Sequence, residues 1–140
     1  MSAPMRAVVI SLVVAVSLVV LALPNDAAAD CGDRIVLSAT ADGAAVVASG
    51  VAYVGSLEAG AQQTFIVQVN AAVPDGTQLL VFTNGLPAGT VTVAGAMATL
   101  DLSTATGALP AGVDPVCEIG PIWVTDAAQT ATLLLGPEIN

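Results

Sequence analysis

Two sets of side chains in this sequence could do chemistry: the carboxylates and a pair of cysteines. The chain has 11 Asp and Glu residues, no histidine, no lysine and two arginines, Arg6 and Arg34. A serine or cysteine nucleophile needs a basic partner, and none of the usual bases is available. Carboxylate pairs can act alone only when a cleft holds them together. The composition therefore predicts a protein that is not an enzyme, with a carboxylate-only hydrolase as a remote alternative.

The first 29 residues have the layout of a secretory signal. Arg6 is followed by an apolar run over 7–23 and then by small residues that end at Ala29. A positive start, an apolar helix and a small-residue cleavage site are what the export machinery recognises. We expect cleavage after Ala29, which leaves residues 30–140 as one domain, secreted, periplasmic or part of the cell envelope. An uncleaved membrane anchor is the alternative.

The two cysteines, Cys31 and Cys117, are predicted to form a disulfide. Exported domains mature in an oxidising compartment, where two thiols in one small domain normally pair. A redox site would need a Cys-x-x-Cys motif and a zinc site would need further ligands, and the sequence has neither. The bond would close a long loop and stabilise the domain by about 4.5 kcal/mol in the chain-entropy model.

The acidic residues beside the cysteines form the one candidate binding site for an ion. Closing the disulfide brings four carboxylates into one corner, with Arg34 nearby. Calcium prefers oxygen ligands on loops, although the ligand spacing of an EF-hand is absent. The corner is thus either a calcium site or a solvated acidic rim that Arg34 partly neutralises, and no other cofactor is expected. The four candidate ligands are Asp30, Asp33, Asp114 and Glu118.

The charge of the chain limits its partners. The formal net charge is −9, and removal of residues 1–29 leaves it unchanged because Arg6 and Asp26 are lost together. Nucleic acids and anionic membranes are bound by clustered Lys and Arg, which this chain lacks. We therefore expect no nucleic-acid partner and, after signal cleavage, no membrane association.

The pattern of residues 30–140 is typical of an all-β domain. Apolar residues recur at every second position in short runs that Gly, Pro, Asp and Asn separate. Seven or eight short strands predict an antiparallel β-sandwich of immunoglobulin-like character, with a small β-barrel as the alternative. The predicted strands are 34–40, 46–56, 62–70, 78–83, 89–94, 96–103, 119–125 and 130–135.

Three segments between these strands have the composition of tight turns. They are Asp42-Gly43, 74–76 (Pro-Asp-Gly) and Asn84-Gly85. Glycine and asparagine tolerate positive φ, and proline presets φ for a reversal. The longest irregular segment is expected at 104–115, which is rich in Ala, Gly and Pro.

Several segments resemble parts of a known group of proteins. A strand, an Asn-Gly turn and a Gly-Thr-Val-Thr-Val strand are followed by an alternating strand and a closing strand. The segments concerned are 48–53, 64–69, 81–85, 88–93, 98–104 and 132–136. In this order they resemble small exported bacterial β domains. The resemblance implies an exported β-sandwich and implies no activity or catalytic residue.

The outward positions of the predicted strands carry Thr, Gln, Ser, Asn and Ala instead of Lys and Glu. Natural sheets usually guard their edges with charge, especially lysine. A neutral sheet can accept a partner strand or stack against another copy. We therefore expect a non-enzymatic structural or protein-interaction module of the bacterial cell envelope or extracellular space. It would bind a protein partner, or itself, through sheet edges, unless short twisted edges keep it monomeric.

A small secreted ligand-binding or inhibitor domain is the alternative. Such a domain would be a stable monomer that presents one ordered loop, here 104–115. The single Tyr53 and the single Trp123 are expected to pack in the core or at its rim and not to form a binding platform.

Overall fold

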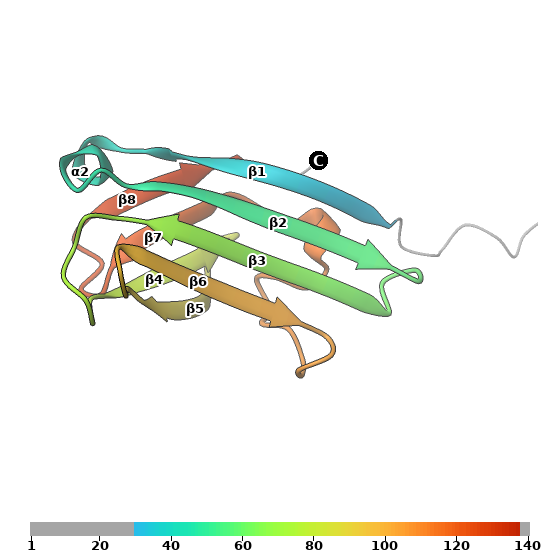
Figure 1. Ribbon diagram of the computed structural model, residues 1–140. Helices are drawn as coiled ribbons and strands as arrows, with labels where there is room; N and C mark the ends of the chain where they lie inside the picture. Colours follow the sequence, from blue (N-terminus) through green and yellow to red (C-terminus); the bar gives the residue numbers. More distant parts are fainter. Residues whose placement is uncertain (1–29, 138–140) are drawn as a thin grey trace, which may run out of the picture.

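The computed structural model describes residues 30–137, so the predicted signal at 1–29 lies outside the described residues. The fold is all-β, as predicted, with eight antiparallel strands (Figure 1). A short helix and a 3-10 turn are the other elements described: α2 (Ala41–Ala45) and η1 (Val116–Glu118). The strands are β1 (Cys31–Ala39), β2 (Ser49–Leu57), β3 (Gln62–Asn70), β4 (Gln78–Thr83), β5 (Leu86–Thr92), β6 (Met97–Ser103), β7 (Ile122–Asp126) and β8 (Thr132–Gly136).

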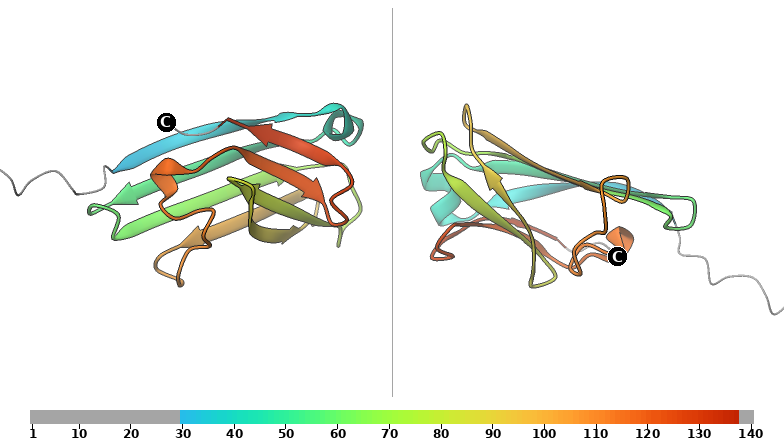
Figure 2. Two further views of the ribbon diagram at one scale, coloured as in Figure 1. Left: turned by 180° about the vertical axis from the view of Figure 1, so that it is seen from behind. Right: turned by 90° about the horizontal axis from the view of Figure 1, so that it is seen from below.

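The strands form one sheet in the order β5-β4-β7-β8-β1-β2-β3-β6. The sheet folds over at β1, because residues 31–37 pair with β2 whereas Ser38 and Ala39 pair with β8. Two layers result, β1-β2-β3-β6 over β5-β4-β7-β8 (Figure 2). The end strands β5 and β6 are not paired with each other, but they pack side by side. Gly89 in β5 lies so close to Leu100 in β6 that an added Cβ on Gly89 would be 2.6 Å from Leu100 Cδ1. The architecture therefore lies between the predicted sandwich and the predicted barrel.

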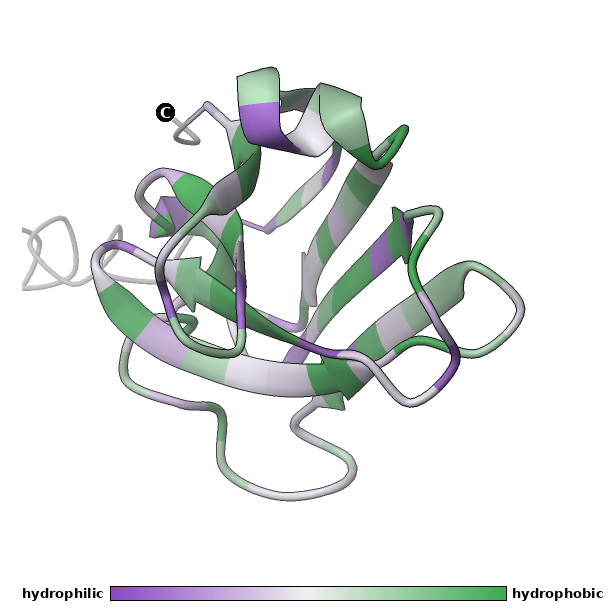
Figure 3. Ribbon diagram, turned by 90° about the vertical axis from the view of Figure 1, so that its left-hand side faces the viewer, coloured by the Kyte–Doolittle hydropathy of each residue, from purple (hydrophilic) through white to green (hydrophobic). Residues whose placement is uncertain are grey.

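One aliphatic core fills the space between the layers. Strand β3 buries every second side chain, as expected for a strand with one face toward the core. Figure 3 shows apolar and polar residues alternating along the strands. The largest fully buried side chains are Phe65, Leu79, Ile122 and Leu134.

Two of the three predicted turns are confirmed, and one is wrong. Asn84 and Gly85, with φ of 53° and 76°, reverse the chain between β4 and β5, and Gly76 has φ of 90° in the turn before β4. Asp42-Gly43 is not a turn but part of helix α2, which has 5 residues. A helix this short shows no apolar period, so the sequence pattern could not predict it.

Helices that could cross a membrane are not found in the range 30–137, where every helix is too short or too polar to do so.

Candidate interaction surface

The predicted disulfide is confirmed. Cys31 at the start of β1 is bonded to Cys117 in η1, with 5.8 Å between the two Cα atoms. The bond ties the first residue of β1 to the end of the long loop that follows β6. It therefore links the β1-β2-β3-β6 layer to the chain that leads into β7.

The acidic residues beside the disulfide do not form a group of metal-ligating side chains, and the calcium site stays a prediction. Among the residues that the structure describes, no three acidic, histidine or cysteine side chains could hold a metal ion together. Asp30 Oδ1 accepts a hydrogen bond from the backbone N–H of Ala59 at 3.1 Å, and Asp114 Oδ1 accepts one from Gln63 at 3.0 Å. No three of the four predicted ligands form a metal-binding group: Asp30, Asp33, Asp114 and Glu118.

Calcium should therefore leave the stability of the protein unchanged. We expect the same melting temperature in millimolar calcium and in chelator, because a calcium site needs about six to eight oxygen ligands around one point. Differential scanning calorimetry measures this directly. A rise of several degrees in calcium that chelator reverses would restore the calcium prediction.

A buried glutamine holds the long loop against the sheet. Gln63 in β3 is 8% exposed, and its Nε2 donates to Asp114 Oδ1 at 3.0 Å. Its Oε1 accepts from the backbone N–H of Val116 at 2.9 Å. The backbone N–H of Gln63 also donates to Thr104 Oγ1 at 3.0 Å. Both ends of the loop are thus anchored on one residue.

Removal of this anchor should destabilise the fold. Gln63→Ala leaves the buried N–H of Val116 without its partner, and we expect a loss of about 2–3 kcal/mol in the free energy of unfolding. Gln62→Ala changes the exposed neighbour and should cost less than about 0.5 kcal/mol. Urea denaturation of the two variants tests the difference, and equal losses would contradict the anchoring role.

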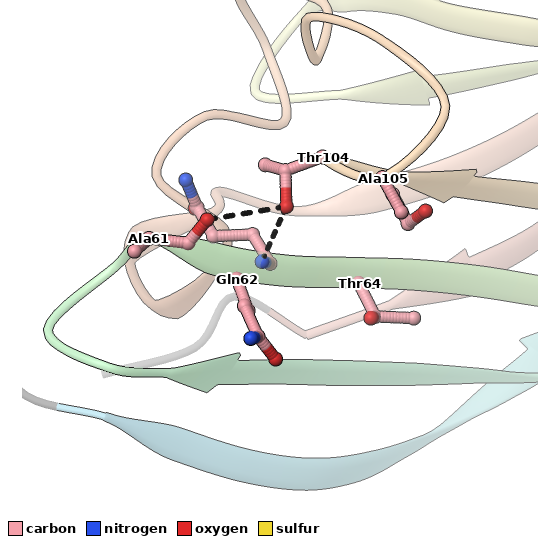
Figure 4. Close-up of a pocket in the computed structure, with 7 residues that line it drawn as sticks. Ala61, Gln62, Thr64, Thr104 and Ala105 are labelled. Carbon is pink, nitrogen blue, oxygen red and sulfur yellow. Dashed lines mark hydrogen bonds between the residues drawn. The ribbon is translucent and has the colours of Figure 1, made fainter.

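A polar hollow lies beside this anchor, where β3 begins and β6 ends (Figure 4). Its volume is about 480 Å³, and its lining offers amides and hydroxyls but no ionisable side chain. Thr104 Oγ1 is already bonded to the backbone N–H of Gln63 and to the carbonyl of Ala61. The lining residues are Ala61, Gln62, Gln63, Thr64, Ser103, Thr104 and Ala105. The hollow can hold a neutral polar molecule, but it has no group for acid–base chemistry.

A larger surface is the solvent side of the β1-β2-β3-β6 layer, which faces the viewer in Figure 1. We call it the outer face. Residues that are paired on neighbouring strands form rows across the outer face, and each row runs in the order β1, β2, β3, β6. The three complete rows are Gly32–Gly55–Thr64–Ser103, Arg34–Tyr53–Ile66–Asp101 and Val36–Val51–Gln68–Thr99.

Apolar side chains gather in the middle of the outer face. Val36 is 57% exposed and Tyr53 is 38% exposed, while Val51 and Ile66 are half-buried. Aromatic and β-branched residues on neighbouring strands contact one another across the sheet. The four side chains therefore form one continuous apolar patch, and Tyr53 lies on it instead of in the core or at its rim.

The charges of the outer face cancel, although the protein is acidic. Its three rows contain one cation, Arg34 on β1, and one anion, Asp101 on β6. The two residues stand at opposite ends of the same row. Neighbouring strands are about 4.8 Å apart, so three spacings separate the two by about 14 Å. They cannot pair within one chain.

The other layer is less suited to binding. Its two aromatic residues, Phe82 and Trp123, stack on each other with ring centroids 6.0 Å apart. Phe82 is buried and Trp123 is half-buried, as expected for packing at the rim of a core. The exposed apolar side chains of this layer are Leu86 and Leu135.

Asp126, the last residue of β7, has a shifted pKa. The side chain of Thr130 donates to the Asp126 carboxylate, and this hydrogen bond is the main cause of the lowered pKa, followed by one from the backbone of Ala131. The pKa of Asp126 is lower in the folded protein than in the unfolded chain. The ionised Asp126 carboxylate therefore stabilises the fold at any pH above its unfolded-state pKa. This stabilisation is lost as the pH falls through the pKa that Asp126 has in the folded protein.

Comparison of the chain with protein-family models, with curated proteins and with solved structures finds no match.

Proposed function

We propose that the protein is a non-enzymatic, exported interaction module that binds a protein partner through the outer face. The observation that carries this proposal is the continuous apolar patch of Val36, Val51, Tyr53 and Ile66 on a face whose charges cancel. Protein-binding surfaces are depleted in charge at their centre and enriched in aromatic residues. A contiguous exposed apolar patch on a folded domain marks such a site.

The disulfide and the composition support export and a non-catalytic role. A disulfide between Cys31 and Cys117 fits an oxidising compartment such as the periplasm, the cell envelope or the extracellular space. The absence of histidine and lysine from the sequence removes the common general bases. Both features favour a stable binding scaffold.

Binding through sheet edges, as predicted from the sequence, remains a second route. Edge strand β5 contains Pro87, which has no N–H to donate, and edge strand β6 carries Asp101. Proline and charge both protect an edge against strand addition. The outer face is favoured over the edges because it has no such protection at its centre.

A small ligand-binding domain is the alternative that the polar hollow supports. The hollow offers hydroxyls and amides to a neutral ligand. However, the side chains of Gln63 and Thr104 already make hydrogen bonds within the chain. The outer face is therefore the stronger candidate.

Paired serine substitutions in the producing cells test the proposal. We expect the wild type to migrate above its monomer mass on a native gel of cell extract, and the variant Tyr53→Ser/Ile66→Ser to migrate as a monomer. The control variant Leu86→Ser/Leu135→Ser removes two exposed apolar side chains from the other layer and should migrate like the wild type. Equal migration of the two variants, or a monomeric wild type, would contradict the role of the outer face.

A further inference from the structure

We propose that the partner at the outer face is a second copy of the same chain, packed face to face about a twofold axis that runs parallel to the strands between β2 and β3. This inference rests on the proposed function, since it names the occupant of the same surface. Three features favour a second copy: the order of residues across the strands, the spacing of packed sheets and the charge of the protein.

The central row of the outer face is complementary to itself. Its order is Arg34, Tyr53, Ile66, Asp101 across β1, β2, β3 and β6. A twofold axis between β2 and β3 reverses this order in the second copy. Each Arg34 then faces the partner copy's Asp101, and each Tyr53 faces the partner copy's Ile66. Packed sheets lie about 10 Å apart, a distance that an arginine and an aspartate span together.

The same row excludes the other twofold arrangement. An axis that runs across the strands along this row would place Arg34 against its own copy and Asp101 against its own copy. Like charges in an interface repel and disfavour that arrangement. The charge order therefore selects one geometry, with the β1-β2 half of each copy over the β3-β6 half of the other.

The neighbouring rows fit the selected geometry in shape. In the row Gly32–Gly55–Thr64–Ser103, the two glycines come to face the partner copy's Ser103 and Thr64. Glycine has no side chain, so it leaves room for the facing hydroxyl-bearing side chain. The third row places Val36 and Val51 over the partner copy's Thr99 and Gln68, and no charged residue faces an apolar one in these three rows.

Net charge also favours a second copy on this face. The chain carries a net charge of −9, so two copies repel each other in most orientations. The three rows of the outer face sum to zero charge, which makes it a surface where two copies can approach. Four strands of about seven residues cover roughly 19 Å by 24 Å, so two copies bury on the order of 1,000 Å². This area is at the lower end for specific complexes, and we expect a dissociation constant in the micromolar range.

Charge reversal tests the geometry residue by residue. The purified protein with its disulfide formed is examined by sedimentation equilibrium over a range of concentrations, together with Arg34→Asp, Asp101→Arg and the double variant. Both positions are exposed, so the variants should keep the wild-type melting temperature. We expect each single variant to dimerise about tenfold more weakly than the wild type or worse, and the double variant to recover the wild-type dissociation constant.

Mixing the two single variants gives the sharpest result. In the mixed dimer, the aspartate introduced at position 34 of one copy faces the arginine introduced at position 101 of the other, and the unchanged Arg34 faces the unchanged Asp101. We therefore expect an equimolar mixture to dimerise like the wild type although each variant alone dimerises weakly. A wild type that stays monomeric up to millimolar concentration would overturn the second copy as partner and leave the proposed function to its own test. A wild-type dimer that neither single variant weakens, or that mixing does not restore, would overturn the geometry.

Discussion

Replacement of both cysteines, Cys31→Ser together with Cys117→Ser, is expected to lower the melting temperature by roughly 20 °C. The bond joins residues 86 positions apart, and closing a loop of this length removes about 4.5 kcal/mol of chain entropy from the unfolded state. A domain of this size has a total stability of only about 5–15 kcal/mol. Differential scanning calorimetry of the variant measures the loss.

Reduction of the wild-type protein provides the control for this variant. The reduced protein and the double serine variant lack the same covalent link, so we expect their melting temperatures to agree within a few degrees. A fall of less than about 5 °C in both would mean that the unfolded chain is already compact without the bond, contrary to the chain-entropy account.

The substitution Gly43→Ala is expected to cost about 3 kcal/mol or more, although alanine is the better helix former. Gly43 lies in helix α2, where an added Cβ would be 1.9 Å from the carbonyl oxygen of Leu133 in β8. The neighbouring backbone N–H of Thr40 donates to the same oxygen at 3.0 Å, so the helix cannot move away without loss of this bond. The approach is between two backbones, and no side-chain rotation relieves it.

A glycine in open space provides the matched control for Gly43. An added Cβ on Gly32 would meet nothing within 4 Å, so Gly32→Ala should leave the free energy of unfolding within about 0.5 kcal/mol of the wild type. Urea denaturation at low protein concentration compares the two variants. If Gly43→Ala proves as stable as Gly32→Ala, helix α2 does not pack on β8 as described.

Much of the fold could be predicted from the sequence, because the alternation of apolar residues and the turn residues between the strands agree with the observed strands. The predicted strands 62–70 and 78–83 match β3 and β4 at both ends, since alternation and flanking turns mark them clearly. Helix α2 could not be predicted, because it has only 5 residues and its contact with β8 comes from far along the chain. The helix also shortens the predicted strand 46–56, since β2 begins at Ser49.

The candidate surface could be predicted only in its composition. The sequence alone shows that the outward positions of the strands lack Lys and Glu, and it also shows the pair of cysteines. The row that joins Arg34, Tyr53, Ile66 and Asp101 could not be predicted, because it depends on the register of β1 with β2 and of β3 with β6. The pairing of β3 with β6 brings together residues that are distant in sequence, and a shift by one residue would turn every side chain to the other side.

The arrangement of the acidic residues could not be predicted, because nearness to the disulfide does not fix the direction of a carboxylate. Asp30 and Asp114 both lie near the disulfide, yet each carboxylate accepts a hydrogen bond from a different strand or turn. Both hydrogen-bond partners are distant along the chain, so the sequence does not indicate where these carboxylates point.

Site-specific photo-crosslinking in the producing cells detects directly whether the outer face is a contact surface. A photoreactive phenylalanine analogue is placed at Tyr53 on the outer face and, as a control, at the exposed Thr90 of β5 in the other layer. We predict crosslinked product from position 53 and none from position 90, with a product of twice the monomer mass if the partner is a second copy. No product from position 53, or equal product from both positions, would show that the outer face is not a specific contact surface.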